Sequence, residues 1–198
     1  QLNGARLAGC DFSNADFSDT DLTSQDFSNG NLTGAMFSNA VVKGWNIKGC
    51  TLEAVVIDNV DLEGYDFSGL ELPGADFAGS RLKGAKFKGC NLDGADFAQA
   101  DVSGANFKGA NLNNGSLLLA DATGANFHDA QMEETTLHDA KLEQASFAGA
   151  SLLSVSFAGV DLSNVEIAAG NFLRCEFRQC KMSGLNLRGS KFPLCDFE

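Results

Sequence analysis

Histidine and cysteine are the side chains of this sequence with the widest chemistry, because both bind metal ions and both act in acid–base or nucleophilic catalysis. His128 and His138 are its only histidines, and the closest two of its six cysteines, Cys175 and Cys180, are five residues apart. No Cys-x-x-Cys pair typical of a zinc site occurs. There is also no phosphate-binding glycine loop, no Gly-x-Ser-x-Gly elbow and no Ser/His/Asp set. The sequence therefore predicts no enzyme activity and neither a metal nor another cofactor.

Acidic side chains offer a second kind of chemistry, the attraction of cations. Asp and Glu outnumber Lys and Arg by 26 to 14, which gives a formal net charge of −12. This charge argues against direct binding of nucleic acid or of an anionic membrane, since cationic side chains supply the attraction to both. No apolar run is long enough to span a bilayer. The charge favours solubility, or a basic protein partner.

The groups just described are positioned by a repeat of five residues. From Leu2 to Phe197, every fifth residue except Ala122 is large and apolar, and all 16 phenylalanines lie in this series. We call this residue the centre of its repeat. Ala or Cys is common two residues before the centre, Asp or Asn one residue before it, and Gly or Asn two residues after it. The consensus is Ala-(Asp/Asn)-(Leu/Phe)-x-Gly.

A period of five fits neither regular secondary structure. Residues five apart are rotated by roughly 140° in a helix and point to opposite faces in a strand, so neither element would bury one continuous row. The chain must turn once per repeat, and Gly, Asn and Asp after the centre tolerate the positive φ of tight turns. Most phenylalanines have numbers ending in 7. This alternation predicts a four-sided coil of 20 residues in which two Phe-rich columns face each other.

The repeat resembles the pentapeptide-repeat family over the whole chain. The triplets that carry the resemblance include Ala95-Asp96-Phe97, Ala105-Asn106-Phe107 and Ala110-Asn111-Leu112. The family resemblance implies an all-β fold, a right-handed four-sided parallel β-helix with about ten coils. We expect residues 1–198 to form a single domain. Because the chain begins and ends inside the repeat and no terminal cap is visible, we also expect it to be a fragment of a longer protein.

Folding the sequence into such coils gathers acids on one side. We call the side formed by residues 15–19 and their equivalents at steps of 20 the acidic side, and the opposite one, formed by residues 25–29 and their equivalents, the basic side. The candidate partner-binding acids are Asp16, Asp19, Asp58, Asp76, Asp96, Asp139, Glu176 and Asp196. Either these acids imitate the phosphates of a DNA duplex, or they repeat an Asp that only favours the turn.

Four further residues are candidates for contact with a partner. Trp45 and Tyr65, the only Trp and Tyr, occupy the small position two residues before the centre in adjacent coils. Large rings overpack that position, so either the coil widens or the rings turn outward as interface anchors. Leu153 and Leu173 align on the outside of adjacent coils. Aligned exposed leucines indicate contact with a partner or with flanking sequence.

The four-sided coil also places the cysteines and histidines. All six cysteines occupy the small inward position, where a free thiol fills space. Cys175 and Cys195 stack in adjacent coils, close enough for a disulfide, but their parallel side chains give it poor torsion. Unpaired thiols are typical of a reducing compartment, so we expect a cytoplasmic protein. His128 and His138 fall on opposite sides of the coil, where both are solvated and cannot form one acid–base pair.

Continuous walls without a pocket or convergent polar groups predict a non-catalytic scaffold for protein–protein interaction. Resemblance to the DNA-mimicking members of the family implies a narrower alternative, binding to a type II topoisomerase with inhibition or protection of gyrase. A further alternative is the repeat domain of a larger secreted effector or assembly protein. The sequence does not name the protein partner, and end-to-end or side-by-side association of the rod with itself is compatible with it.

Overall fold

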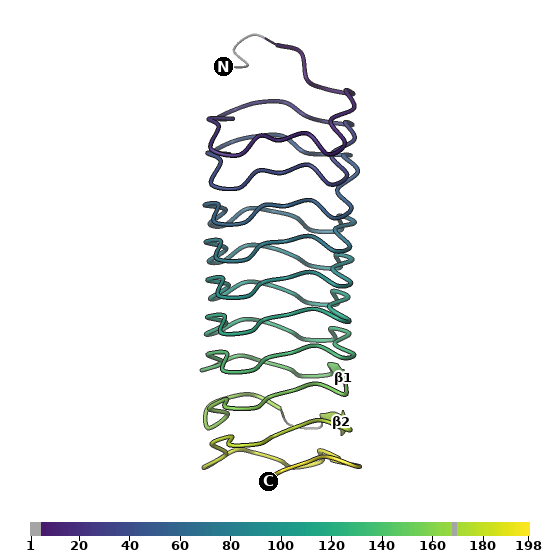
Figure 1. The fold of residues 1–198 in the computed structure, drawn as a ribbon. Coiled ribbons are helices and arrows are strands. Elements are labelled where there is room, and N and C mark those ends of the chain that lie inside the picture. The colour runs from purple at the N-terminus through teal and green to yellow at the C-terminus, as the bar shows by residue number, and fades with distance from the viewer. Residues whose placement is uncertain (1–4, 168–169) are drawn as a thin grey trace.

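The chain folds into a straight-sided rod of successive coils. The computed structural model describes residues 5–167 and 170–198, and the coils run from the N-terminal end of the rod to its C-terminal end (Figure 1). Single parallel bridges join residues 20 apart along most of the rod, such as Asp101 with Asp121. This register confirms the coil of 20 residues, and the fold is the expected right-handed four-sided parallel β-helix.

Two short strands stand out near the C-terminal end of the rod. β1 (Ser151–Leu153) and β2 (Asn171–Leu173) belong to adjacent coils and pair in parallel, with Leu152 opposite Phe172. Among the residues that the structure describes, no helix is long and apolar enough to cross a membrane.

Every backbone N–H of a regular repeat has a partner, as the repeat 106–110 shows. The first N–H bonds to the preceding coil, the second and fourth bond to the following coil, and the fifth closes a turn inside the repeat. The third bonds to the side chain of the first residue. The bonds are Asn106 N to Ala85 O (2.9 Å), Phe107 N to Asn126 O (2.8 Å), Lys108 N to Asn106 Oδ1 (3.1 Å), Gly109 N to His128 O (2.9 Å) and Ala110 N to Phe107 O (2.9 Å). The Asp or Asn before the centre therefore serves the one N–H that neither ladder nor turn uses.

The residue two after the centre turns the chain at each corner, as expected. Gly109 has a φ of 65° and Asn114 a φ of 57°. Leu119 adopts the same left-handed conformation, with a φ of 58°, although its side chain disfavours it. The ladder of hydrogen bonds therefore imposes the corner geometry, and residues such as Leu119 that disfavour a positive φ adopt it as well.

Phenylalanine columns fill the interior as the alternation predicts. Phe67, Phe87 and Phe107 stack with ring centroids 4.9 Å apart and nearly parallel planes. Phe97, in the opposite column, meets Phe87 edge to face at 5.5 Å. All four rings are fully buried. Burial of such a side chain contributes about 1.5–3 kcal/mol and an aromatic pair adds about 0.5–1.5 kcal/mol, so these columns are the main source of stability.

The small position two residues before the centre points inward and is usually a fully buried alanine, as at Ala105. Two polar residues at this position are buried as well. Ser80 Oγ donates a hydrogen bond to Ile57 O (2.7 Å), and Thr135 Oγ1 donates one to Leu112 O (2.8 Å). Each acceptor is the carbonyl of a centre residue in the preceding coil. The Leu112 carbonyl also accepts the turn bond from Gly115 N, whereas Val60 N donates to Ser80 Oγ (2.9 Å) in place of the Ile57 carbonyl. The small position therefore offers a polar side chain a ready partner.

Trp45 is a core residue, so of the two orientations that the sequence left open for it, the inward one is observed. Its side chain is 3% exposed and packs against Phe37, with ring centroids 5.2 Å apart. Tyr65 is half-buried, with its ring 6.2 Å from that of Trp45 and 4.6 Å from that of Phe67. The Trp45 ring therefore lies inside the coil, where burial of its large apolar surface is favourable.

The first prediction tests the inward register of the small position. Ala105→Trp should lower the free energy of unfolding by about 1–3 kcal/mol, because the indole overfills a closed site. Lys108→Ala should change it by less than about 0.5 kcal/mol, because only an exposed face is altered. Denaturant unfolding of both variants beside the wild type measures the difference. Equal effects would contradict the register.

The second prediction concerns alkaline pH. Burial raises the pKa of the Tyr65 hydroxyl to about 12, with a smaller contribution from the negative charge of the Cys50 thiolate. The pKa is about 10 in an unfolded chain. The neutral phenol therefore stabilises the fold fully below about pH 10, and this contribution is lost as the pH rises towards about 12.

Tyr65 is the only tyrosine, so the ultraviolet absorbance of its phenolate follows this titration directly. We expect half-ionisation well above pH 10 in the folded protein, and Tyr65→Phe should remove both the absorbance change and its share of the alkaline destabilisation. A midpoint at the ordinary value in the folded state would show that the ring is solvated.

Candidate interaction surface

The histidines form no catalytic pair. His128 Nε2 lies 3.1 Å from Asp129 Oδ2, and His138 Nε2 lies 3.0 Å from Asp139 Oδ2. Each imidazole thus pairs with the carboxylate of its own sequence neighbour on an open surface. Within residues 5–167 and 170–198, no group of three or more His, Cys, Asp or Glu side chains could hold a metal ion. Each of these contacts joins a partly exposed imidazole to an exposed carboxylate.

The cysteines are free thiols that act as hydrogen-bond donors inside the wall. Five of them donate to the carbonyl of a centre residue in the preceding coil, as Ser80 and Thr135 do. The bonds run from Cys50 to Phe27 O (3.0 Å), Cys90 to Phe67 O (2.8 Å), Cys175 to Leu152 O (3.5 Å), Cys180 to Phe157 O (2.9 Å) and Cys195 to Phe172 O (3.1 Å). The sequence showed that these residues are small and inward, but it did not reveal this bond.

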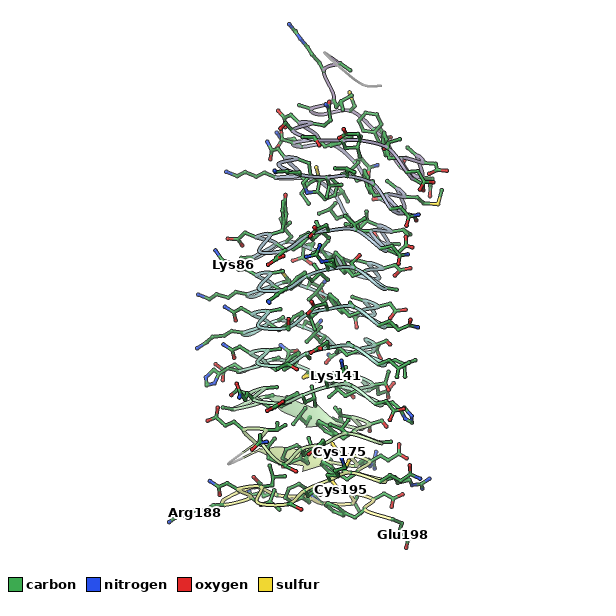
Figure 2. All side chains as sticks on the ribbon, turned by 90° about the vertical axis from the view of Figure 1, so that its left-hand side faces the viewer. Lys86, Lys141, Cys175, Arg188, Cys195 and Glu198 are labelled. Atoms are coloured by element: carbon green, nitrogen blue, oxygen red, sulfur yellow. The ribbon has the colours of Figure 1, made fainter. Side chains whose placement is uncertain are left out.

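Burial also makes these thiols poor nucleophiles. It raises the pKa of Cys90 to about 11 and that of Cys175 to about 12. Since the thiolate is the reactive form, neither residue is activated for chemistry at neutral pH. Cys175 and Cys195 lie one above the other near the C-terminal end of the rod (Figure 2). Their role in the structure is to fill and hydrogen-bond the wall.

Half of the candidate acids have a structural task. Each of four carboxylates accepts the N–H of the residue two positions further on, the bond that Asn106 makes in its repeat. The four pairs are Asp16 with Ser18 N (2.9 Å), Asp76 with Ala78 N (2.8 Å), Asp96 with Ala98 N (2.8 Å) and Asp196 with Glu198 N (3.1 Å). The hydrogen bonds from Ser18 lower the pKa of Asp16. These aspartates would be favoured in the repeat even without a partner.

The densest acid cluster on this side consists of Asp58, Asp76 and Asp96. Asp76 and Asp96 are bridged directly in adjacent coils. Burial raises the pKa of Asp76, and the neighbouring charges of Asp96 and Asp58 raise it further. Asp58 accepts hydrogen bonds from the Ser38 hydroxyl and from Asn59 Nδ2. Mutual repulsion between like charges makes this cluster the place where a cationic partner gains most.

Further along the rod the row of acids is interrupted. The column of Asp76 and Asp96 continues as Ser116, Thr136 and Ser156 before it reaches Glu176. The acids that follow are partly neutralised. Arg178 lies 3.4 Å from Glu176 and 2.6 Å from Asp196, and Asp139 is paired with His138. Asp19 and Asp139 sit at corners with positive φ, at 57° and 53°. The candidate acids therefore form separate groups and not one continuous track.

Apolar side chains occupy the interruption. Leu118 and Leu119 are 36% and 51% exposed on the acidic side, and Met36 is 37% exposed on the same side closer to the N-terminus. Leu153 and Leu173 pair in β1 and β2 on a neighbouring side, where both are half-buried. The acidic side thus combines charge with exposed apolar surface. Leu118 and Leu119 are more exposed than Leu153 and Leu173, the two leucines predicted as contact residues.

Cations gather on the opposite side of the rod. Lys86 and Arg188 project from one edge of the molecule and Glu198 from the other (Figure 2). Lys86 pairs with Asp66 across adjacent coils at 3.5 Å, and Lys108 lies 4.0 Å from Asp129. The acidic side and the basic side therefore carry different charge, as the sequence predicts, and present different surfaces to a partner.

A solved structure of QnrB1 shares this architecture. A trypsin-treated variant of QnrB1, described as a plasmid-mediated fluoroquinolone resistance protein, aligns with a TM-score of 0.60 at 20% identity over 97% of this chain and 89% of that one. HetL, a pentapeptide repeat protein involved in heterocyst differentiation regulation from the cyanobacterium Nostoc sp. strain PCC 7120, aligns with a TM-score of 0.43 at 21% identity over 89% of this chain and 90% of that one. No curated protein matches the chain.

Family models cover almost all of the sequence. The model described as pentapeptide repeats in eight copies matches residues 1–39, 15–53, 46–84, 100–139, 130–167 and 162–198. A second model, of nine copies, matches residues 72–116. Together with the coil register and the corner geometry, these matches establish that the chain belongs to the pentapeptide-repeat family.

Proposed function

We propose that the protein is a non-catalytic scaffold that binds a basic protein partner through its acidic side. The observation that carries this proposal is the coincidence on one side of the Asp58, Asp76 and Asp96 cluster with the exposed Met36, Leu118 and Leu119. Protein interfaces combine apolar contact with complementary charge, and one wall of the coil presents both. The fold that this chain shares with other members of its family supports a scaffold of this kind.

Imitation of DNA towards a type II topoisomerase is the narrower version of this proposal. The net charge of −12 and the acidic side favour it. The shared fold with a fluoroquinolone resistance protein is compatible with it. Against it, Leu118 and Leu119 interrupt the acids where a phosphate track would continue. A partner that carries a short cationic patch beside an apolar one fits this surface better than a partner with a long cationic groove.

The third prediction removes charge without removing structure. Asn accepts the same backbone N–H as Asp, as Asn106 does, so Asp76→Asn with Asp96→Asn neutralises the cluster and keeps both turns. The matched control is Asp101→Asn with Asp121→Asn on a neighbouring side, where both aspartates accept equivalent bonds. Both double variants change the net charge equally. Only the first should weaken partner binding, by about fivefold or more, given about 0.5 kcal/mol for each exposed charge pair.

The binding probes are a lysine-rich peptide and DNA gyrase, measured at low and at moderate salt. Attraction through the acidic side should fall steeply with salt, because exposed charges are screened over about 10 Å at 0.1 M. Equal losses in the two double variants would overturn the acidic side as the binding surface. Wild-type binding to the peptide but not to gyrase, with no inhibition of supercoiling, would overturn the DNA-mimic version and leave the scaffold.

A further inference from the structure

Single expected bridges between coils are missing at several points, for example between Lys141 and Asp161, but at one place three consecutive bridges are missing, and we call this place the seam. The seam lies between residues 41–52 and residues 61–71. Bridges join Met36 to Val56 and Val56 to Asp76, so the ladder is closed on the acidic side. Between these points no bridge is formed where the register would place three, at the pairs Val41–Asp61, Asn46–Asp66 and Thr51–Glu71, all within the described residues. The coils are thus joined along one side and parted along the other three.

The backbone hydrogen bonds of the seam are missing as well. In a regular coil the N–H groups of the centre residue and of the residue two after it bond to the next coil. Leu62, Gly64 and Phe67 do so, with Arg81 O (2.8 Å), Lys83 O (2.9 Å) and Lys86 O (2.8 Å) as acceptors. The equivalent residues one coil earlier are Val42, Gly44 and Ile47. Within the described part of the chain, their N–H groups make no such bond. A groove of about 670 Å³ lies over this region, between residues 39–44 and 59–65.

Trp45 and Tyr65 lie at the seam. They occupy the small inward position in the two coils that part, whereas the same column continues as Ala85, Ala105 and Ala125 in coils whose ladder is complete. Their rings lie 6.2 Å apart, and Trp45 Nε1 is buried without a hydrogen-bond partner. An orphaned buried donor is costly, so the site is held in place by the packing of the rings and not by polar contacts.

We propose that Trp45 and Tyr65 form a wedge that makes the seam the flexible joint of the rod. Neighbouring coils of a solenoid are held only by the interface between them, so the interface with the fewest bonds opens first and most often. Because the ladder stays closed on the acidic side, that side acts as the hinge line. Opening on the basic side bends the rod towards the acidic side, which becomes concave. The joint lets the coils before the seam adjust to a partner independently of the coils after it.

Amide hydrogen exchange of the wild-type protein tests the joint directly. The N–H groups of Val42, Gly44 and Ile47 should exchange at least tenfold faster than those of Leu62, Gly64 and Phe67. The two sets have the same burial pattern at their repeat positions and differ in whether the ladder is formed. Equal protection of the two sets would overturn the proposal.

A pair of double variants tests the wedge. Trp45→Ala with Tyr65→Ala extends the alanine column through the seam, and the three seam amides should then become protected to the level of their equivalents one coil on. The control, Phe87→Ala with Phe107→Ala, removes two stacked rings from an intact section and should reduce protection there. If the first variant instead loses protection around the seam as the control does, the rings are ordinary core residues and the wedge is excluded.

The reverse experiment moves the wedge. Ala105→Trp with Ala125→Tyr places the two rings in adjacent coils of the same column, within an intact section. The amides of Val102, Gly104 and Phe107, which bond to the next coil in the wild type, should then exchange faster while distant coils keep their protection. Uniform loss of protection along the rod, or none, would contradict a local device.

Discussion

Each repeat of five must find a partner for five backbone N–H groups, and the rest of the molecule depends on how it does so. Four are used by the ladders and the corner turn, and the remaining one needs a side-chain acceptor, as Lys108 N finds in Asn106 Oδ1. An unpaired buried amide is costly, which is why Asp or Asn precedes the centre so often. Much of the acidity of the chain is therefore a by-product of backbone geometry. Only those side chains of the acidic side that the backbone hydrogen bonds do not require can indicate a function.

Two features of the acidic side satisfy that criterion. Asp58 lies one residue after its centre and accepts side-chain bonds rather than the backbone bond of its repeat, so the turn does not demand an acid there. Leu118 and Leu119 are exposed at positions where most repeats carry a polar residue or glycine. Asp16 and Asp196, by contrast, are explained by their own turns. The surface is thus a mixture of structural acids and residues that only an interaction would favour.

The fold was predictable from sequence because its signal is repeated along the whole chain. One wrong residue cannot disturb a period of five, and the Phe columns at Phe87 and Phe97 stack and cross as the alternation indicated. The orientation of the Trp45 side chain was not predictable. The pattern shows that a Trp overfills this position, but it does not show whether the ring turns outward or the neighbouring coils rearrange. The outward direction of Leu118 and Leu119 follows from their positions in the repeat, and the structure exposes both. The thiol bonds, such as that of Cys90, depend on exact spacing between coils, which no single repeat encodes.

The centre carbonyl that lies beside each small inward side chain also affects which substitutions the sequence tolerates during evolution. An exchange of alanine for serine, cysteine or threonine at this position places a new donor beside an acceptor that is already in place, as at Ser80, Thr135 and Cys90. Mutation can therefore wander among these four residues with little effect on fitness. Hydrogen bonding and packing alone therefore suffice to accommodate the five cysteines that donate to these carbonyls, without any sulfur chemistry.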